Sequence, residues 1–158
     1  ALEGYKREVA LVENDIATYQ CRWVKLKVVN QRSPWLKKIN YLSLPVAHQE
    51  GKFIAPKKIL GKLNKKKLII CKYVNDYGFL AKKRFPYNPN GSIDDIAAIT
   101  NPKGNVLAMM PHPERALYFL QRPDWINQKG KIKNKLLNKG KLYADGYKIF
   151  KNAYNYFK

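Results

Sequence analysis

Residues 106–115 constrain the fold more than any other segment of this chain. A short apolar run ends at Pro111, His112 stands between two prolines, and Glu114 follows two residues later. Each proline fixes its own φ and disfavours helical backbone in the residue before it, so we expect His112 in a stiff, extended loop at a strand end. Histidine titrates near neutral pH, and a neighbouring carboxylate can fix its tautomer, as in a catalytic triad. The spacing alone nevertheless favours a plainer alternative, a surface histidine beside a glutamate at a helix N-terminus.

Apolar runs of strand length predict a sheet in the rest of the chain. The expected strands cover residues 21–29, 40–47, 67–74, 95–100 and 105–110. A turn at residues 101–104 joins the last two strands as a hairpin, which places His112 just past the end of a hairpin strand. Residues 3–20 are expected to form an irregular loop. Residues 128–141, rich in Lys, Asn and Gly, are expected to form an exposed insertion.

Three helices are expected. Residues 56–63 form a short helix in which Pro56 suits the first turn. Residues 114–121 form a second helix, which Pro123 ends. The third covers the C-terminal segment, where aromatic residues recur at helical spacing: Tyr147, Phe150, Tyr154 and Phe157. Such a stripe predicts an amphipathic helix whose aromatic side chains enter the core.

The chain is strongly basic, with 31 Lys and Arg against 11 Asp and Glu and a net charge of +20. A nucleic-acid partner is the first inference from such a charge. Three observations disfavour it. Only 6 of the basic residues are Arg, which recognises phosphates and base edges better than Lys does. The lysines are spread along the whole chain, and abundant Asn, Ile and Tyr indicate a drift in composition. Charge runs are usually solvated surface, and docking onto an acidic partner is another possible role.

A chain of 158 residues with 46% hydrophobic residues suits one globular domain. No apolar run approaches the ~20 residues that span a bilayer. Two cysteines in strand-like runs indicate no disulfide framework. No signal peptide is visible at the start given, so a reducing cytoplasm is the expected location. Neither a membrane nor nucleic acid is an expected partner.

Three ordered blocks lie around His112: residues 45–53 (PVAHQEGKF), 87–97 (YNPNGSIDDIA) and 109–115 (MMPHPER). Their order and spacing resemble the glutaminase-subunit family of phosphoribosylformylglycinamidine synthase, a class I (triad-type) glutamine amidotransferase family of purine biosynthesis. Residues 21–24 (CRWV) and 144–146 (ADG) are similar to it as well, so the resemblance covers nearly the whole chain. It implies an α/β fold of the class I glutamine amidotransferase type, with a flavodoxin-like three-layer sheet and antiparallel hairpin additions.

The nucleophilic cysteine of the family is missing from this sequence. Family members carry it in a Gly-x-Cys-x-Gly elbow between a strand and a helix, and no such motif occurs here. Cys21 and Cys71 stand in strand-like runs without those glycines, and a strand cysteine is usually a small buried hydrophobe, so we expect both to be buried. The first residues, with no Met and no glycine-rich turn, resemble the segment after the elbow helix. We therefore expect one amidotransferase domain over residues 1–158 that is truncated before residue 1, with the elbow shortly upstream.

The resemblance also implies a division of chemical roles. A cysteine thiolate attacks the side-chain amide of glutamine, ammonia leaves, and water hydrolyses the thioester. By match to the family motif, His112 activates the thiol and protonates the leaving ammonia, while Glu114 orients His112. Ammonia then passes to a synthetase subunit that amidates formylglycinamide ribonucleotide. ATP and Mg²⁺ are expected on that partner, and no cofactor or metal is expected on this chain, which lacks a phosphate-binding loop.

The second candidate is the loop of His48, Gln49 and Glu50. In related amidotransferases a loop at this place lines the glutamine pocket with backbone groups near the synthase interface, so the resemblance implies that role here. The family more often has glycine where Gln49 stands, and glycine accepts a positive φ that glutamine rarely adopts. An equally compatible role for His48 is to brace the loop by hydrogen bonds. We interpret four further residues first as structural turn residues, and alternatively as part of a loop that signals to the partner: Asn88, Asn90, Gly91 and Ser92.

Three functions therefore remain open. The chain is a fragment of a purine-biosynthesis glutaminase, a catalytically inactive amidotransferase-like module that binds a partner, or a basic nucleic-acid-binding domain. Because the nucleophile is missing, we expect the 158 residues by themselves to release no ammonia from glutamine.

Overall fold

The computed structural model describes residues 8–128, 130 and 142–158. Almost all of the insertion expected at residues 128–141 therefore lies outside the described residues. The strands are β1 Ala10–Val12, β2 Gln20–Val28, β3 Tyr41–His48, β4 Lys52–Ile54, β5 Ile69–Val74, β6 Ile96–Thr100 and β7 Leu107–Met109. The α-helices are α1 Lys57–Lys65 and α3 Asp145–Phe157. Short 3₁₀ helices cover Pro34–Leu36, Ile93–Asp95, Pro113–Arg115, Phe119–Gln121 and Ile126–Gln128.

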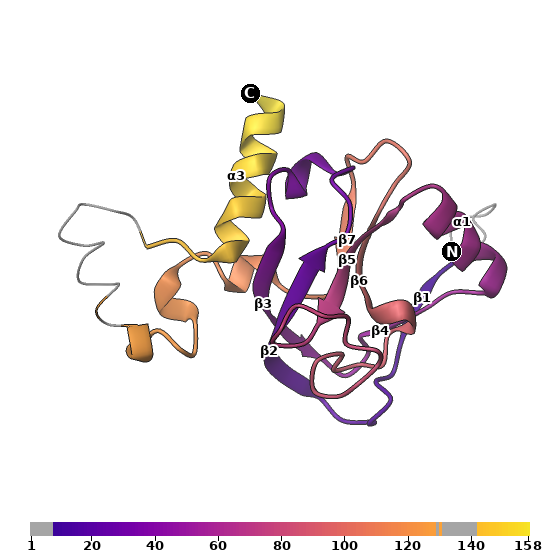
Figure 1. Cartoon of the computed structure of the whole chain (residues 1–158), viewed down its shortest axis with the longest axis horizontal. Coiled ribbons are helices and arrows are strands. Elements are labelled where there is room, and N and C mark those ends of the chain that lie inside the picture. Colours follow the sequence, from indigo (N-terminus) through magenta and orange to yellow (C-terminus); the bar gives the residue numbers. More distant parts are fainter. Residues whose placement is uncertain (1–7, 129, 131–141) are drawn as a thin grey trace.

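The centre of the molecule is a five-stranded antiparallel sheet with the order β3-β2-β5-β6-β7 (Figure 1). The five predicted strands are confirmed to within a few residues. The turn between β6 and β7 is confirmed as well: the Gly104 amide donates to the Asn101 carbonyl at 2.9 Å, and Gly104 has φ +81°. Strands β1 and β4 form a separate antiparallel pair.

Strand β2 shows how sequence alternation fixes the two faces of the sheet. Val24, Leu26 and Val28 are buried, while Lys25 and Lys27 are exposed, because successive side chains point to opposite faces. Cys21 shares its parity with the two lysines and is exposed. The prediction that Cys21 is buried was therefore wrong, whereas Cys71 on β5 is fully buried as predicted.

Helix α3 lies beside β3, on the far side of the molecule from α1 and the β1–β4 pair (Figure 1). Its buried residues are Gly146 and Ile149, and Ala153 packs against the same core one turn later. The predicted aromatic core stripe was wrong, since Phe150 is 44% and Tyr154 66% exposed. The aromatic residues are exposed because the helix packs the face that carries Gly146, Ile149 and Ala153 against the core.

Two further expectations were wrong, and both concern segments without a strong period. The expected loop at residues 3–20 contains β1, whose register with β4 runs from Ala10↔Ile54 to Val12↔Lys52. The expected helix at residues 114–121 is replaced by two short 3₁₀ helices. The intervening backbone instead pairs with the chain entering α3: the Phe119 amide donates to the Leu142 carbonyl at 2.8 Å. An amide engaged in that pairing cannot also form a helical hydrogen bond.

None of the helices among the described residues is long and apolar enough to cross a membrane.

Candidate active site

His112 lies three residues beyond β7, in the stiff loop that its two prolines predict. Its amide donates to the Pro45 carbonyl of β3 at 2.8 Å, which ties the loop to the sheet edge. Its ring Nδ1 lies 2.7 Å from Glu114 Oε1. The two side chains are 30% and 54% exposed, respectively, so the pair lies at the surface. The predicted histidine and carboxylate are thus brought together in hydrogen-bond contact.

The second ring nitrogen of His112 is free. Nε2 is buried and has no hydrogen-bond partner among the described residues. If the Glu114 carboxylate accepts the Nδ1 proton, Nε2 carries a lone pair that can take a proton. A buried ring nitrogen without a partner is uncommon and calls for an explanation. This arrangement is that of a base with one nitrogen oriented and one nitrogen available.

The start of α3 holds the His112 loop in place. The Gly146 amide donates to the Ala116 carbonyl at 2.9 Å. A Cβ at Gly146 would lie 1.9 Å from the Pro113 carbonyl oxygen, so only glycine allows this approach. The Asp145 carboxylate accepts the Ser43 amide of β3 at 2.8 Å. Residues 144–146 therefore fasten the helix to both the His112 loop and the sheet.

His48 has different surroundings from those of His112, although its Nδ1 is likewise buried without a hydrogen-bond partner among the described residues. It is the last residue of β3, not part of a loop as predicted, and is only 5% exposed. Its Nε2 lies 3.4 Å from Asn90 Nδ2, and its carbonyl accepts from Asn14. Burial lowers the pKa of His48, its own backbone hydrogen bond opposes this, and the charge of nearby His112 lowers it further. His48 is therefore held neutral, an arrangement that favours the bracing role.

Asn14 clamps the turn that follows His48. Its amide nitrogen Nδ2 donates to the His48 carbonyl at 3.0 Å, and its Oδ1 accepts from the Gly51 amide at 3.2 Å. Its backbone amide donates to the Gln49 carbonyl at 2.8 Å. Gln49 and Glu50 are exposed, and neither has a positive φ, so the glutamine needs no strained backbone. Sequence reasoning missed Asn14, because it stands in a segment without a period.

A buried polar network continues from His48 through Asn90. Asn90 Nδ2 donates to the Tyr73 hydroxyl at 3.2 Å, and Asn90 Oδ1 accepts from the Ser92 hydroxyl at 2.7 Å. Asn88 Oδ1 accepts the backbone amides of Gly91 and Ser92. Its Nδ2 donates to Asp95, a buried carboxylate that also accepts from the backbone of residues 82–83. These contacts agree with the interpretation of this segment as turn chemistry.

Neither cysteine meets the requirements of a nucleophile at this site. Burial raises the pKa of Cys71 to about 12, so its thiolate is not available near neutral pH. Cys21 is exposed, but it lies within the pairing of β2 with β3, opposite Ala47, and not in an elbow between a strand and a helix.

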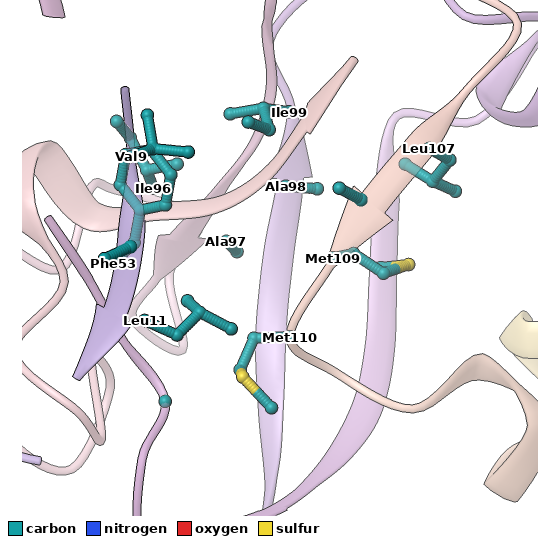
Figure 2. A pocket seen from close by; sticks show the side chains of 13 residues that line it. Val9, Leu11, Phe53, Ile96, Ala97, Ala98, Ile99, Leu107, Met109 and Met110 are labelled. Carbon is teal, nitrogen blue, oxygen red and sulfur yellow. The ribbon is translucent and has the colours of Figure 1, made fainter. Parts of the chain in front are cut away.

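An apolar hollow of about 440 Å³ opens beside β7, just before His112 (Figure 2). Val9, Phe53 and Ile96 line one side and Leu107 the other, with the small side chains of Ala97 and Ala98 between them. Met110 and Leu11 lie at one end. On its other edge β7 has no strand partner among the described residues. The surface next to His112 is thus apolar and ends in an unpaired strand.

Comparison with known proteins identifies the family. The model of the CobB/CobQ-like glutamine amidotransferase domain matches residues 2–157. The chain belongs to this family, and its fold is that of the class I glutamine amidotransferases, as the sequence blocks predicted.

Individual relatives carry a more specific name. The phosphoribosylformylglycinamidine synthase subunit PurQ of Methanococcus maripaludis (strain C7) is 36% identical over 152 residues, which are 96% of this chain and 56% of the relative. PurQ of Prochlorococcus marinus (strain SARG) is 46% identical over 110 residues, 68% of this chain and 45% of the relative. A chain in the structure of PurLQS from Thermotoga maritima matches with a TM-score of 0.62 and 28% identity, over 98% of this chain and 55% of that one. This chain spans about half the length of the curated relatives it matches.

Proposed function

We propose that this chain supplies the base half of a glutaminase that provides ammonia for the amidation of formylglycinamide ribonucleotide. The carrying observation is the 2.7 Å contact of His112 Nδ1 with Glu114, combined with a buried Nε2 that has no partner among the described residues. His112 is the general base, which takes the thiol proton on Nε2 and returns it to the leaving ammonia. Glu114 orients the ring and stabilises the imidazolium.

The nucleophilic thiol comes, in this proposal, from polypeptide outside residues 1–158. The sequence has no Gly-x-Cys-x-Gly, and the two cysteines it has are unsuited in the ways described above. The apolar hollow and unpaired edge of β7 lie directly before His112, where a further strand could deliver a thiol to Nε2. We propose that residues 1–158 form part of a single amidotransferase domain completed in this way.

The names of the relatives, a synthase subunit and a chain of PurLQS, support a partner subunit, and the cofactors are part of the proposal. We propose that the complete protein acts with a synthetase subunit, which binds ATP and Mg²⁺, while this chain holds neither. The exposed Gln49 and Glu50 are the candidate pocket or interface residues, with His48 as their buried support. A cytoplasmic location accords with this role.

The test uses the full-length protein that contains these residues, with glutamate and ammonia release from glutamine as the readout. We expect His112→Asn to reduce turnover by about a thousandfold, since general acid–base catalysis contributes on the order of 10²–10⁴. Cys21→Ser and, because Cys71 lies in the apolar core, Cys71→Ala should each leave turnover unchanged. Loss of turnover in either folded cysteine variant, or full activity of His112→Asn, would contradict the proposal.

A second candidate, an inactive partner-binding module, rests on the absence of a nucleophile motif from the sequence. A glutamine analogue that alkylates the nucleophilic thiol distinguishes the two. Covalent labelling of the full-length protein at a cysteine outside residues 1–158 supports the glutaminase. Absence of labelling and of ammonia release in the complex with the synthetase subunit supports the inactive module.

A further inference from the structure

Two lysines stand directly opposite each other on neighbouring strands, and neither forms an ion pair among the described residues. In the antiparallel pairing of β2 with β5, Lys27 is the register partner of Lys72. Like charges in directly opposed positions destabilise a sheet, because the side chains lie within a few ångströms of each other. The next lysine on the same face of β2, Lys25, by contrast forms an ion pair: its Nζ lies 2.9 Å from the Asp76 carboxylate.

The opposed pair lies in a hollow of about 450 Å³. The hollow is lined by Lys27, Val29, Asn30, Leu63, Asn64, Lys67, Ile69, Lys72 and Leu80. Three of these residues are cationic and none is acidic. Among the described residues, none of the three lysines takes part in an ion pair. The volume falls within the range of small-molecule sites, roughly 300–1,000 Å³.

The backbone of the third lysine, Lys67, is held by hydrogen bonds. Lys67 follows α1 with φ +53°, and its amide donates to the Asn64 carbonyl at 3.0 Å. Its own carbonyl accepts from Asn30 Nδ2 at 3.2 Å. The hollow therefore has a backbone frame that does not depend on the flexible lysine chains.

The helix dipole does not explain this arrangement. Cations are favoured at a helix C-terminus, which accounts for Lys62 and Lys65 in the last turn of α1. Lys27 and Lys72 stand on strands, where that effect does not operate. A solvated charge run does not explain them either, since they are far apart in sequence and brought together only by the sheet. Without an anion the two ammonium groups repel each other, and an anion bound between them would remove that repulsion.

From this juxtaposition we propose that the hollow between β2, β5 and the end of α1 binds the phosphoryl group of a small molecule. Lys27, Lys72 and Lys67 neutralise its charge, and the apolar residues Leu63 and Leu80 flank the part that carries the phosphate. The site is separate from the proposed base: no hydrogen bond or ion pair of the described residues links it to His112.

The test measures binding of pyrophosphate to the full chain by calorimetry, with sodium chloride of equal ionic strength as the reference. We expect saturable binding that Lys27→Gln and Lys72→Gln each weaken by about tenfold or more, as loss of a charge-assisted contact predicts. Lys57→Gln and Lys58→Gln, at the exposed start of α1, are the matched controls and should bind as the original chain does.

A second readout guards against variants that merely unfold. Without phosphate and at low salt, Lys27→Gln should have a free energy of unfolding no lower than that of the original chain, because it relieves the repulsion with Lys72. Equal effects of pyrophosphate and chloride, or equal losses in the control variants, would overturn the proposal. So would binding of RNA alone without binding of pyrophosphate, since that outcome assigns the charge to a nucleic-acid surface.

Discussion

The two histidines of this chain lie near each other but have opposite surroundings. His48 is almost fully buried, and its backbone and Nε2 are engaged by two asparagines. His112 is partly exposed, one ring nitrogen contacts a carboxylate, and the other has no partner among the described residues. Each ring has one buried nitrogen without a hydrogen-bond partner among the described residues, Nδ1 in His48 and Nε2 in His112. The difference teaches that exposure and a carboxylate neighbour, and not residue type or an unpaired nitrogen, separate a structural histidine from a candidate base. Each prediction below tests one side of this contrast.

The largest effect is expected for Glu114→Gln in the full-length protein. An amide can still touch Nδ1, but it does not stabilise the imidazolium and can select the wrong tautomer. We expect turnover of glutamine to fall by about 10²–10⁴-fold, in the range seen when triad carboxylates are neutralised. The readout is the pH profile of kcat together with its magnitude. Asp76→Asn, which removes a surface carboxylate paired with Lys25, is the control and should change neither.

Asn14→Ala should remove the hydrogen bonds that hold the turn after His48. The side chain is 3% exposed and makes hydrogen bonds to Thr18, His48 and Gly51. Its removal leaves buried backbone groups unpaired, so we expect the free energy of unfolding to fall by about 3 kcal/mol. Denaturant titration measures it. Asn105→Ala, at an exposed turn position, should cost less than about 0.5 kcal/mol. Similar losses in both variants would show that Asn14 is not the clamp.

Gly146→Ala should disturb the His112 loop through the contact of α3 with the Pro113 carbonyl. Alanine favours a helix interior by about 1 kcal/mol over glycine. Here the added methyl group would meet the Pro113 carbonyl oxygen, and overpacking typically costs about 1–3 kcal/mol. Because the atoms it meets belong to the backbone, the cost lies toward the upper end, and we expect the free energy of unfolding to fall by about 1–2 kcal/mol, as measured by thermal unfolding. Gly61→Ala in α1 meets no atom within 4 Å and should instead stabilise the chain by up to about 1 kcal/mol. The same sign in both variants would contradict the proposed close contact.

The smallest effect concerns pH. Because the pKa of His48 is lowered in the folded chain, the unfolded chain binds more protons as the pH falls toward and below about 6.5. The stabilising contribution of neutral His48 is thus present above the unfolded pKa and is lost on acidification. The slope is at most about 1.4 kcal/mol per pH unit. His48→Gln should flatten the dependence of the unfolding free energy between pH 5 and 7, as measured by denaturant titration at each pH.

Several features could be predicted from the sequence because they depend on local periods and on fixed backbone chemistry. The alternation in β2, the turn at Gly104 and the loop around His112 all follow from side-chain parity, glycine or proline. The contact of His112 with Glu114 was also predictable, since the two residues are only two positions apart in a stretch whose backbone the prolines restrict. The strand β1 and the clamp by Asn14 were not, because a three-residue strand carries no measurable period.

The errors in the C-terminal helix have the same origin. Its aromatic spacing was recognised, but the face that packs is the one bearing Gly146 and Ile149. Close approach to the Pro113 and Ala116 carbonyls selects that face, and the large rings do not fit there. The sequence pattern identifies an amphipathic helix, whereas the neighbour that it meets decides which stripe is buried.

By itself, the sequence determined the family, the five strands of the central sheet and the contact of His112 with Glu114. Each of these depends on short motifs or on alternation within one segment of the chain. Only the tertiary structure distinguished His48 from His112, placed Cys21 at the surface, and set Lys27 opposite Lys72 on the neighbouring strand. Those outcomes depend on burial and register, which are set by contacts between segments tens of residues apart. A side chain carries its chemistry in the sequence, but its solvation and partners are decided by the fold around it.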